Sequence, residues 1–209
     1  MMRELRPPLG RRERSKRDKR ERILIAAREL FAADGVGGVT TQQIADRADV
    51  AIGTLFLYAS TKAELLIMVQ NDKFAAAIDD GLAAIAADSP DAADALDAVM
   101  AVIRPVVVCA REQIDNGRTY LHELVFGDPA EPNRREGLAR AARLEDGIAQ
   151  VLTRCGAIEH ADAATLARVV SAIIHISVTA TIYRHLSDAA VLDDIRDQIR
   201  AVLAPRRLV

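Results

Sequence analysis

Apolar residues recur at helical spacing along almost the whole chain. Five of the residues between Ile23 and Phe31 follow the i, i+1, i+4, i+7, i+8 pattern that places side chains on one face of a helix. Asp34-Gly35 and Gly37-Gly38 follow directly, and glycines at such positions end helices and extend loops. The pattern therefore predicts a first amphipathic helix that ends near residue 34.

The same spacing, with breaks at glycine, proline and asparagine, predicts eight further helices. They cover residues 41–48, 52–58, 62–87, 91–115, 118–126, 134–155, 161–186 and 188–203. Pro105 lies inside one of them, so we expect a kink or two abutting helices there. Asn116-Gly117 is expected to end that segment. No run alternates apolar and polar residues with hairpin chemistry, so the predicted fold class is all-α with about nine helices.

The segment from Thr40 to Leu65 carries the most informative local pattern. Thr40 followed by Gln43 is a T-x-x-Q capping box, which satisfies backbone N–H groups at a helix start. Asp49-Val50 forms a tight turn, and the next helical stretch is barely two turns long. Two short helices joined by a tight turn and packed on a preceding helix form a helix-turn-helix, whose second helix enters the major groove of DNA.

Polar groups around this turn suit a lattice of DNA phosphates. Thr54 and Tyr58 lie four residues apart on one helical face, and Lys62 begins the next helix, where its ammonium group and that helix's N–H groups can meet a phosphate. Gly53 has no side chain, so the backbone can approach DNA closely. The predicted DNA-contacting residues are Thr41, Gln42, Ile52, Gly53, Thr54, Phe56, Tyr58 and Lys62.

Base recognition falls by position to Gln42, Ile52, Gly53 and Phe56. Ile52 and Phe56 are apolar and could touch thymine methyl groups. The alternative for Phe56 is inward packing. For Leu57 we expect a solvent or packing role.

Charge is unevenly distributed along the chain. There are 28 Lys and Arg against 30 Asp and Glu, but residues 1–22 hold ten basic and four acidic residues, so this segment carries +6 and the remainder −8. A basic arm on an acidic body suggests a polyanionic partner at one end only, and a solvated tail is the alternative. The arm residues that could reach phosphates or the minor groove are Arg11, Arg12, Arg14, Lys16, Arg17, Lys19 and Arg20.

The segment from about residue 20 to 66 resembles the TetR-like (tetracycline-repressor-like) transcription regulators. The resemblance is carried by Ile23-Leu24, Ala26-Ala27, Leu30-Phe31, Gly35, Thr40-Thr41, Ile44-Ala45, Ala48, Val50, Gly53-Thr54-Leu55-Phe56, Tyr58, Lys62 and Leu65. The chain departs from the family pattern at four positions. Asp49 replaces a turn glycine, Ala51 replaces a capping Ser or Thr, Phe56 replaces a tyrosine, and Ala59 replaces an aromatic residue.

The resemblance implies a three-helix DNA-binding head, a fourth linking helix and a ligand-responsive body. We therefore expect a basic, disordered arm over residues 1–19, a helix-turn-helix domain over 20–66 and a helical regulatory and dimerisation domain over 67–209. It also implies a homodimer that forms through helices about 161–186 and 188–203, a double-stranded palindromic operator and a small-molecule effector that releases a repressor from it. An activator, or a regulator without a ligand, remains open.

The resemblance places the effector pocket in the body. The predicted pocket residues are Phe74, Ile78, Met100, Ile103, Val107, Tyr120, Leu124, Ile148, His175 and Thr179. For each apolar residue the alternative is an ordinary core position, and for His175 it is a satisfied core or interface histidine.

Other classes of function find less support in the sequence. No catalytic constellation, phosphate loop or dinucleotide motif is present, so we expect no enzyme and no cofactor. Cys109 and Cys155 lack metal-ligand spacing, so we expect no metal site and two buried thiols, with a redox switch as the alternative. The apolar run Val169–Tyr183 is shorter than a membrane span and no signal peptide is evident, so we expect a cytoplasmic protein without membrane contact. A helical interaction protein that has lost DNA binding remains the alternative class.

Overall fold

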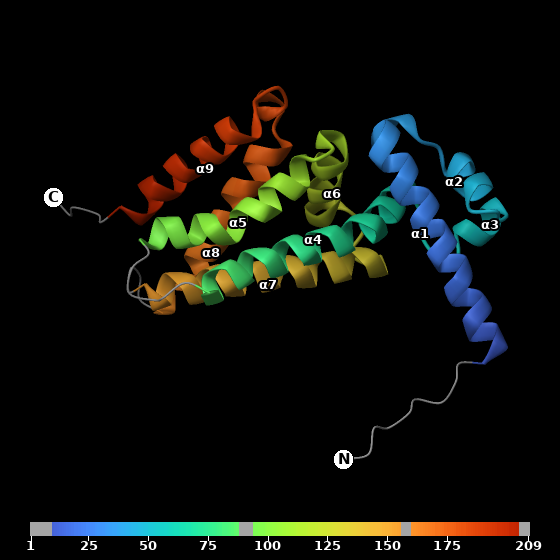
Figure 1. Cartoon of the computed structure of the whole chain (residues 1–209), viewed down its shortest axis with the longest axis horizontal. Helices are drawn as coiled ribbons and strands as arrows, with labels where there is room; N and C mark the ends of the chain where they lie inside the picture. The colour runs from blue at the N-terminus through green and yellow to red at the C-terminus, as the bar shows by residue number, and fades with distance from the viewer. Residues whose placement is uncertain (1–9, 88–93, 156–159, 205–209) are drawn as a thin grey trace, which may run out of the picture.

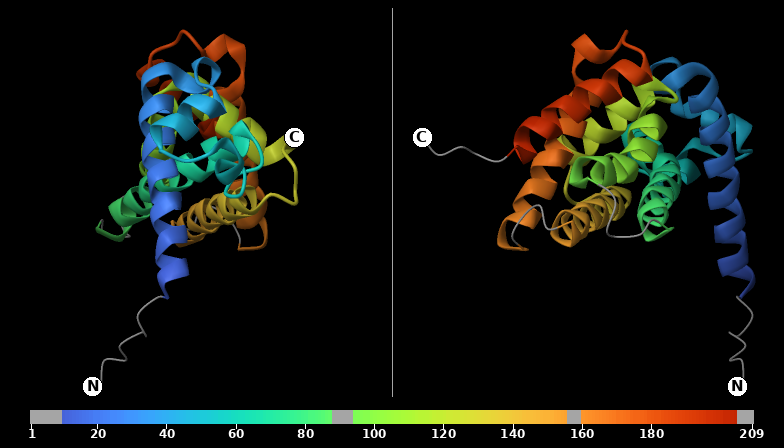
Figure 2. Two further views of the ribbon diagram at one scale, coloured as in Figure 1. Left: turned by 90° about the vertical axis from the view of Figure 1, so that its right-hand side faces the viewer. Right: turned by 60° about the vertical axis from the view of Figure 1, so that its left-hand side comes forward.

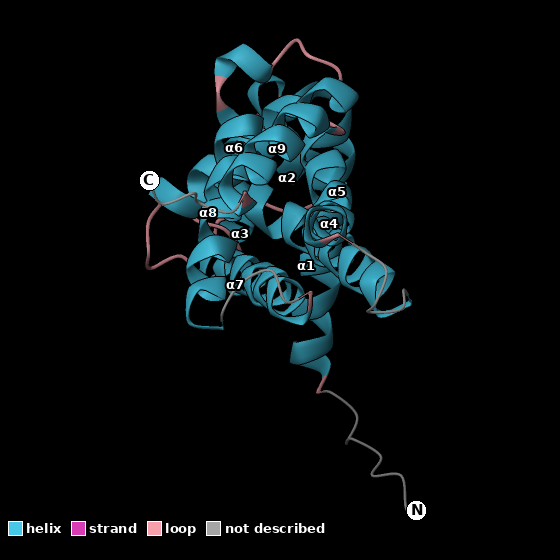
Figure 3. Cartoon of the chain, turned by 90° about the vertical axis from the view of Figure 1, so that its left-hand side faces the viewer, coloured by secondary structure: helices cyan, strands magenta, loops and turns pink. Residues whose placement is uncertain are grey.

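The computed structural model describes residues 10–87, 94–155 and 160–204, and every regular element in these ranges is a helix (Figures 1 and 3). This part of the chain contains α1 (Arg11–Gly38), α2 (Thr41–Arg47), α3 (Ile52–Leu55), α4 (Lys62–Ala87), α5 (Ala95–Arg111), α6 (Ile114–Phe126), α7 (Pro132–Arg154), α8 (His160–Thr179) and α9 (Asp188–Leu203), with a short 3-10 helix, η1 (Thr181–Tyr183), between the last two. The prediction of an all-α fold with about nine helices is confirmed.

Helices α1 to α3 form a head at one end of the molecule, and α5 to α9 form a larger body (Figure 1). Each part has its own apolar core, which includes Ile44 and Leu55 in the head and Ile103 in the body. Helix α4 runs from one part to the other and supplies Leu65 to the first core and Phe74 to the second. Both cores therefore bury residues of one continuous helix, α4.

Helix α1 begins earlier than the sequence predicts. Residues 11–22 are helical and exposed, and they extend beyond α2 and α3 (Figure 2). Residues 11–19, where a disordered arm is expected, are thus helical in this structure, while residues 1–9 lie outside the described part. Arg, Lys and Glu are good helix formers, Glu13 lies four residues before Arg17, and the packed later turns remove the cost of nucleation. The helix breaks where predicted, at Gly35, whose φ is 67°.

The boundary between α5 and α6 also differs from the prediction. Asn116-Gly117 was expected to end a helix, but both residues lie in the first turns of α6. The side chain of Gln113 caps this helix by accepting hydrogen bonds from the N–H groups of Asp115 and Asn116. A Cβ atom at Gly117 would lie only 1.8 Å from the Ala110 carbonyl oxygen, so this glycine permits two helices to touch. Helix α5 continues through Pro105.

Two other helices are shorter than predicted. Helix α3 covers only Ile52–Leu55 of the expected 52–58, and a turn follows in which the Tyr58 N–H donates to the Leu55 carbonyl. Helix α8 ends at Thr179 instead of residue 186, because Ala180 adopts an extended conformation and η1 follows.

Helix α8 is the one helix of the described residues that is long and apolar enough to cross a membrane by length and composition alone. The window runs from Asp162 to Thr179 and includes the charged residues Asp162 and Arg168, so it extends beyond the uncharged run that begins at Val169. Core helices of soluble proteins meet the same test. Here α8 packs against α6, α7 and α9, which is the environment of a bundle helix.

Candidate functional site

The head contains the helix-turn-helix that the sequence predicts. The Gln43 N–H donates to Oγ1 of Thr40 at 3.2 Å, and the Thr40 N–H donates to Oε1 of Gln43 at 2.8 Å, which completes the capping box at the start of α2. Asp49 has a φ of 51° and is the one described non-glycine residue with a positive φ. Aspartate tolerates this conformation, so the turn forms without glycine. No side chain caps α3 at Ala51.

In the second helix of the helix-turn-helix, α3, Gly53 is exposed, and so is the ring of Phe56 directly after it. Phe56 is 44 % exposed, which favours an outward role over inward packing. Gln42 and Gly53 are also exposed, and a Cβ atom at Gly53 would meet nothing within 4 Å. The remaining predicted contact residues are half-buried: Thr41, Ile52, Thr54, Tyr58 and Lys62. This arrangement leaves open space along α3 for a second molecule.

Two of the expected phosphate-binding side chains have partners inside the head. The Tyr58 hydroxyl donates to the Lys16 carbonyl oxygen at 3.0 Å, and Nζ of Lys62 donates to the Val39 carbonyl oxygen at 3.0 Å. An ammonium group has three N–H donors, so Lys62 could hold Val39 and a phosphate together. For both residues a phosphate contact remains a prediction.

The basic stretch of α1, residues 11–22, is tied to the helix-turn-helix from two sides. Tyr58, just after α3, holds the Lys16 carbonyl, and Arg22 forms an ion pair with Asp49 of the turn at 3.0 Å. Both partners of the ion pair are exposed, so it contributes at most about 1 kcal/mol. These contacts nevertheless fix the direction in which the basic stretch leaves the head.

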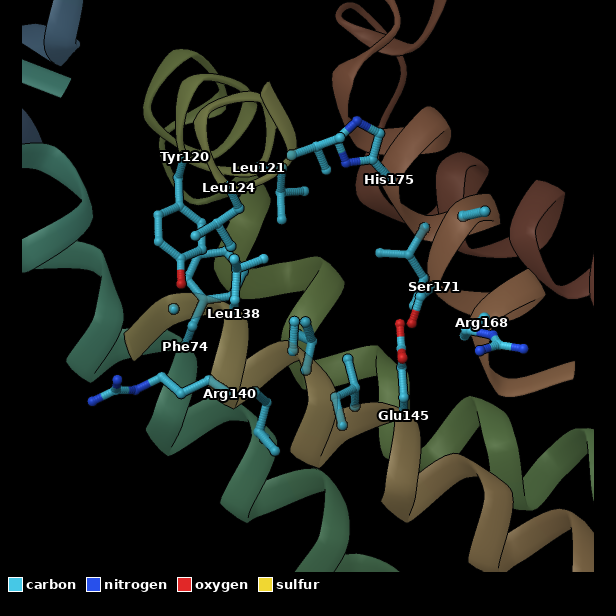
Figure 4. Close-up of a pocket in the computed structure, with 18 of the residues that line it drawn as sticks. Phe74, Tyr120, Leu121, Leu124, Leu138, Arg140, Glu145, Arg168, Ser171 and His175 are labelled. Carbon is cyan, nitrogen blue, oxygen red and sulfur yellow. The ribbon is translucent and has the colours of Figure 1, made fainter. Parts of the chain in front are cut away.

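A cavity of about 420 Å³ lies in the body between α4, α6, α7 and α8 (Figure 4). This volume falls within the usual range of ligand pockets, about 300–1,000 Å³. Five of the ten predicted pocket residues line it, namely Phe74, Ile78, Tyr120, Leu124 and His175. The others do not: Met100, Ile103, Val107 and Ile148 are buried core residues, and Thr179 donates its hydroxyl to the His175 carbonyl.

The cavity wall is largely apolar, with an aromatic pair at one end and polar side chains toward the other. Tyr120 and Phe74 stack at one end with ring centroids 4.3 Å apart, and Figure 4 shows Glu145, Ser171 and Arg168 toward the other. Burial lowers the pKa of His175, and the nearby His122 lowers it further, so the neutral imidazole is favoured at neutral pH. The wall can therefore hold an apolar body and offer hydrogen bonds near one end.

Comparison with known proteins identifies the head. Residues 23–69 match the family model described as "Bacterial regulatory proteins, tetR family". The head of this chain is therefore similar to the heads of tetR-family regulators. The HTH-type transcriptional repressor KstR of Mycobacterium tuberculosis is 38% identical over 61 residues, which are 29% of this chain and 28% of that protein. KstR of Rhodococcus jostii is 40% identical over 53 residues, a quarter of each chain. The match thus spans less than a third of these relatives.

Solved structures extend the likeness to the body of the chain. FadR from Thermus thermophilus, in complex with lauroyl-CoA, superposes with a TM-score of 0.67 at 21% identity, covering 91% of this chain and 95% of that one. FadR from Bacillus subtilis, in complex with stearoyl-CoA, gives a TM-score of 0.61 at 20% identity, covering 86% and 97%. At this identity the likeness shows the fold alone.

The sequence interpretation missed most of the cavity wall that α7 and α8 form. Helix α7 contributes Gly137, Leu138, Ala141 and Leu144, and besides the predicted His175 helix α8 contributes Arg168, Ser171, Ala172, Ile174 and Ile176. The four α7 residues follow the spacing i, i+1, i+4, i+7, which is the signal of one helix face. The side chain of Arg140 also borders the cavity, but its guanidinium group is bonded to Glu136.

Proposed function

We propose that this protein is a DNA-binding transcriptional repressor that a small molecule releases from its operator. The observation that carries the proposal is the tetR-family head, in which the open face of α3 lies beside a helical basic stretch. The KstR relatives are named as transcriptional repressors. In this proposal α3 enters the major groove, and Gln42, Ile52, Gly53 and Phe56 meet base edges.

Phosphate contacts would supply most of the sequence-independent affinity. The basic residues of α1 between Arg11 and Arg20 are exposed, and Tyr58 and Arg22 hold their helix beside the helix-turn-helix. Thr41, Thr54 and Lys62 complete the set of proposed phosphate contacts. A helix instead of a disordered arm places these charges in a fixed row, which favours one direction of approach to the duplex.

We propose a homodimer that binds a palindromic operator. Helices α8 and α9, with η1 between them, expose apolar side chains, and burial of such side chains stabilises an interface. These side chains are Val169, Ile176, Ile182, Leu186 and Val202. Two heads would then read successive major grooves about 34 Å apart.

The effector would bind in the cavity of the body. Its apolar wall suits a ligand with an apolar body, and two FadR structures with the same fold hold acyl-CoA molecules. Acyl-CoA is therefore the first ligand class to test. Repression would be relieved if the ligand binds better to a state in which the heads no longer fit the operator.

The match of the head to the tetR family model supports a regulator over an enzyme, and a regulator of transcription would act in the cytoplasm. The alternative is a helical interaction protein that no longer binds DNA. The exposed basic stretch of α1 favours DNA binding, and salt-dependent binding separates the two alternatives.

The test is fluorescence anisotropy with duplexes from the region upstream of the protein's own gene, in a salt series. We expect one segment to bind at least about 1,000-fold tighter than random DNA. Phe56→Ala should weaken this binding about tenfold, since a base contact is worth about 1–3 kcal/mol. Leu57→Ala, the adjacent exposed apolar residue, is the matched control and should stay within about twofold.

Each outcome has a distinct meaning. Equal affinity for all upstream duplexes and for random DNA would overturn the proposed function. Equal effects of Phe56→Ala and Leu57→Ala would leave DNA binding intact but remove Phe56 from base recognition. Lauroyl-CoA added to the complex should lower the DNA affinity; if it does not, the acyl-CoA assignment fails.

A further inference from the structure

We propose that a buried polar chain, Tyr120–Asn71–Asn133–Glu64, and a clamp formed by Asn116 couple the effector cavity to the DNA-binding head. The inference rests on the proposed function, because it concerns how an occupied cavity alters DNA binding. Asn71, Asn133 and Glu64 act as positioning residues that contact neither DNA nor the effector.

The polar chain starts in the cavity wall and ends at the first turn of α4. The Tyr120 hydroxyl donates to Oδ1 of Asn71 at 3.0 Å, and Nδ2 of Asn71 donates to the Asn133 carbonyl oxygen at 2.9 Å. The Asn133 N–H donates to Oε1 of Glu64 at 2.7 Å. Glu64 directly follows the helix-turn-helix, so three hydrogen bonds connect the cavity to the point where the head joins the body.

All four members of the chain are buried, and Tyr120, Asn71 and Glu64 are at most 2 % exposed. A buried polar group that loses its partner is costly, because water does not replace the lost hydrogen bond. The hydrogen bonds of the polar chain therefore do not weaken gradually. The polar chain stays closed, or the helices that carry it move to a second arrangement in which the groups find new partners.

The polar chain and the cavity wall both contact helix α7 closely at Gly137. A Cβ atom at Gly137 would lie 2.5 Å from Cδ2 of Leu124, 2.9 Å from Oδ1 of Asn71 and 3.3 Å from the Tyr120 hydroxyl oxygen. Leu124 and Tyr120 both line the cavity. Since there is no spare volume at this contact, a ligand that displaces the side chain of Leu124 or Tyr120 also displaces the polar chain.

Asn116 connects helix α6 to the head through two further hydrogen bonds. It lies one turn before Tyr120, its Nδ2 donates to the Phe31 carbonyl oxygen, and its Oδ1 accepts from the Val36 N–H, both at 2.7 Å. Phe31 and Val36 flank the break in α1 at Gly35. A shift of α6 caused at Tyr120 therefore reaches α1, on which α2 packs.

Hydrogen–deuterium exchange of the full-length protein tests the coupling, because coupling is reciprocal. Exchange is measured with and without the upstream duplex that binds in the anisotropy assay. DNA should protect α2 and α3 directly. In the wild type it should also slow exchange in α6 by about fivefold or more, which corresponds to the lower end of typical allosteric couplings.

Three variants separate coupling from simple stability. Tyr120→Phe keeps the ring but removes the hydroxyl, and the DNA-dependent change in α6 should fall below about twofold. Tyr183→Phe is the matched control, since it also removes a hydroxyl bond, to Oδ2 of Asp194 at 2.8 Å, away from the chain. Glu64→Gln retains the oxygen that accepts from Asn133. Both of these variants should retain the DNA-dependent change in α6 that the wild type shows.

The outcomes distinguish the two proposals. If α2 and α3 are protected but α6 is unchanged in the wild type, the coupling is absent although the function stands. If Tyr120→Phe retains the full change in α6, the polar chain does not carry it. If DNA protects neither α2 nor α3, the proposed function fails, and the coupling fails with it.

Discussion

At the scale of single residues, burial of the Glu64 carboxylate costs free energy of folding. Its side chain is 2 % exposed, and burial raises its pKa above the ordinary value of 4.5, although the hydrogen bond from Asn133 acts in the opposite direction. The bond satisfies an N–H group in the first turn of α7, where a carboxylate is favourable. The raised pKa shows that desolvation is the larger effect.

This sign leads to a prediction for the pH dependence of stability. A raised pKa in the folded state means that the fold prefers the protonated carboxyl, so the contribution of Glu64 is complete below pH 4.5 and is lost as the pH rises through the raised pKa. Glu64→Gln should therefore become increasingly more stable than the wild type as the pH rises. Thermal unfolding of both proteins between pH 4 and 8 measures this; a difference that grows toward acid pH contradicts it.

Tyr58 gives a second prediction at this scale, because its hydroxyl is bonded to Lys16. If it acts by holding the basic stretch of α1, Tyr58→Phe should weaken DNA binding by about two- to fivefold, the worth of one hydrogen bond. The loss should become smaller when Arg11, Arg12 and Arg14 are changed to Gln, since three of the seven basic residues between Arg11 and Arg20 are then gone. Anisotropy on the four proteins of this cycle gives the answer. Losses that simply add would instead indicate a direct phosphate contact.

At the scale of helices, α5 and α6 meet through a glycine. A Cβ atom at Gly117 would lie 1.8 Å from the Ala110 carbonyl oxygen, so Gly117→Ala forces the helices apart. We expect a loss of about 1–3 kcal/mol in the free energy of unfolding, the usual cost of overpacking. Gly53→Ala is the control, because open space surrounds it, and it should gain up to about 1 kcal/mol. Urea unfolding compares them; equal effects would contradict the close approach.

The same helices show which features local sequence determines. The capping box of Thr40 and Gln43 and the turn at Asp49 were predictable, because their hydrogen bonds and backbone conformation involve neighbouring residues. Asn116-Gly117 has the composition of a helix stop but lies inside α6. Asn116 bonds to the distant Phe31 and Val36, and Gly117 packs against α5. Only the tertiary fold reveals such partners.

Five of the ten predicted pocket residues line the cavity, and a related reason explains why the other five do not. Helical spacing indicates which face of a helix is apolar, but it does not distinguish a core wall from a cavity wall. Ile103 and Leu124 both lie on apolar faces, yet the first is enclosed by core and the second borders the cavity. The difference depends on how closely neighbouring helices approach, which Gly137 sets in α7.

At the scale of the whole molecule, the proposed dimer determines how tightly DNA is bound. One head reads one half-site, and a second head joined through α8 and α9 binds the other half-site at a high effective concentration. Val169 on α8 and Val202 on α9 are exposed apolar residues of these helices. A charge at either position would have to be desolvated in the interface, which is costly without a partner.

We therefore expect Val169→Asp combined with Val202→Asp to give monomers in analytical ultracentrifugation and to lose about 100-fold or more in affinity for a palindromic duplex. Affinity for a single half-site should remain within about threefold of the wild type, because the head is unchanged. Leu57→Asp, which places the same charge on an 82 % exposed apolar residue of the head, should remain dimeric. If the double variant stays dimeric, the subunits associate through another face. If it becomes monomeric yet binds the palindrome as tightly as before, the two heads do not read the half-sites together.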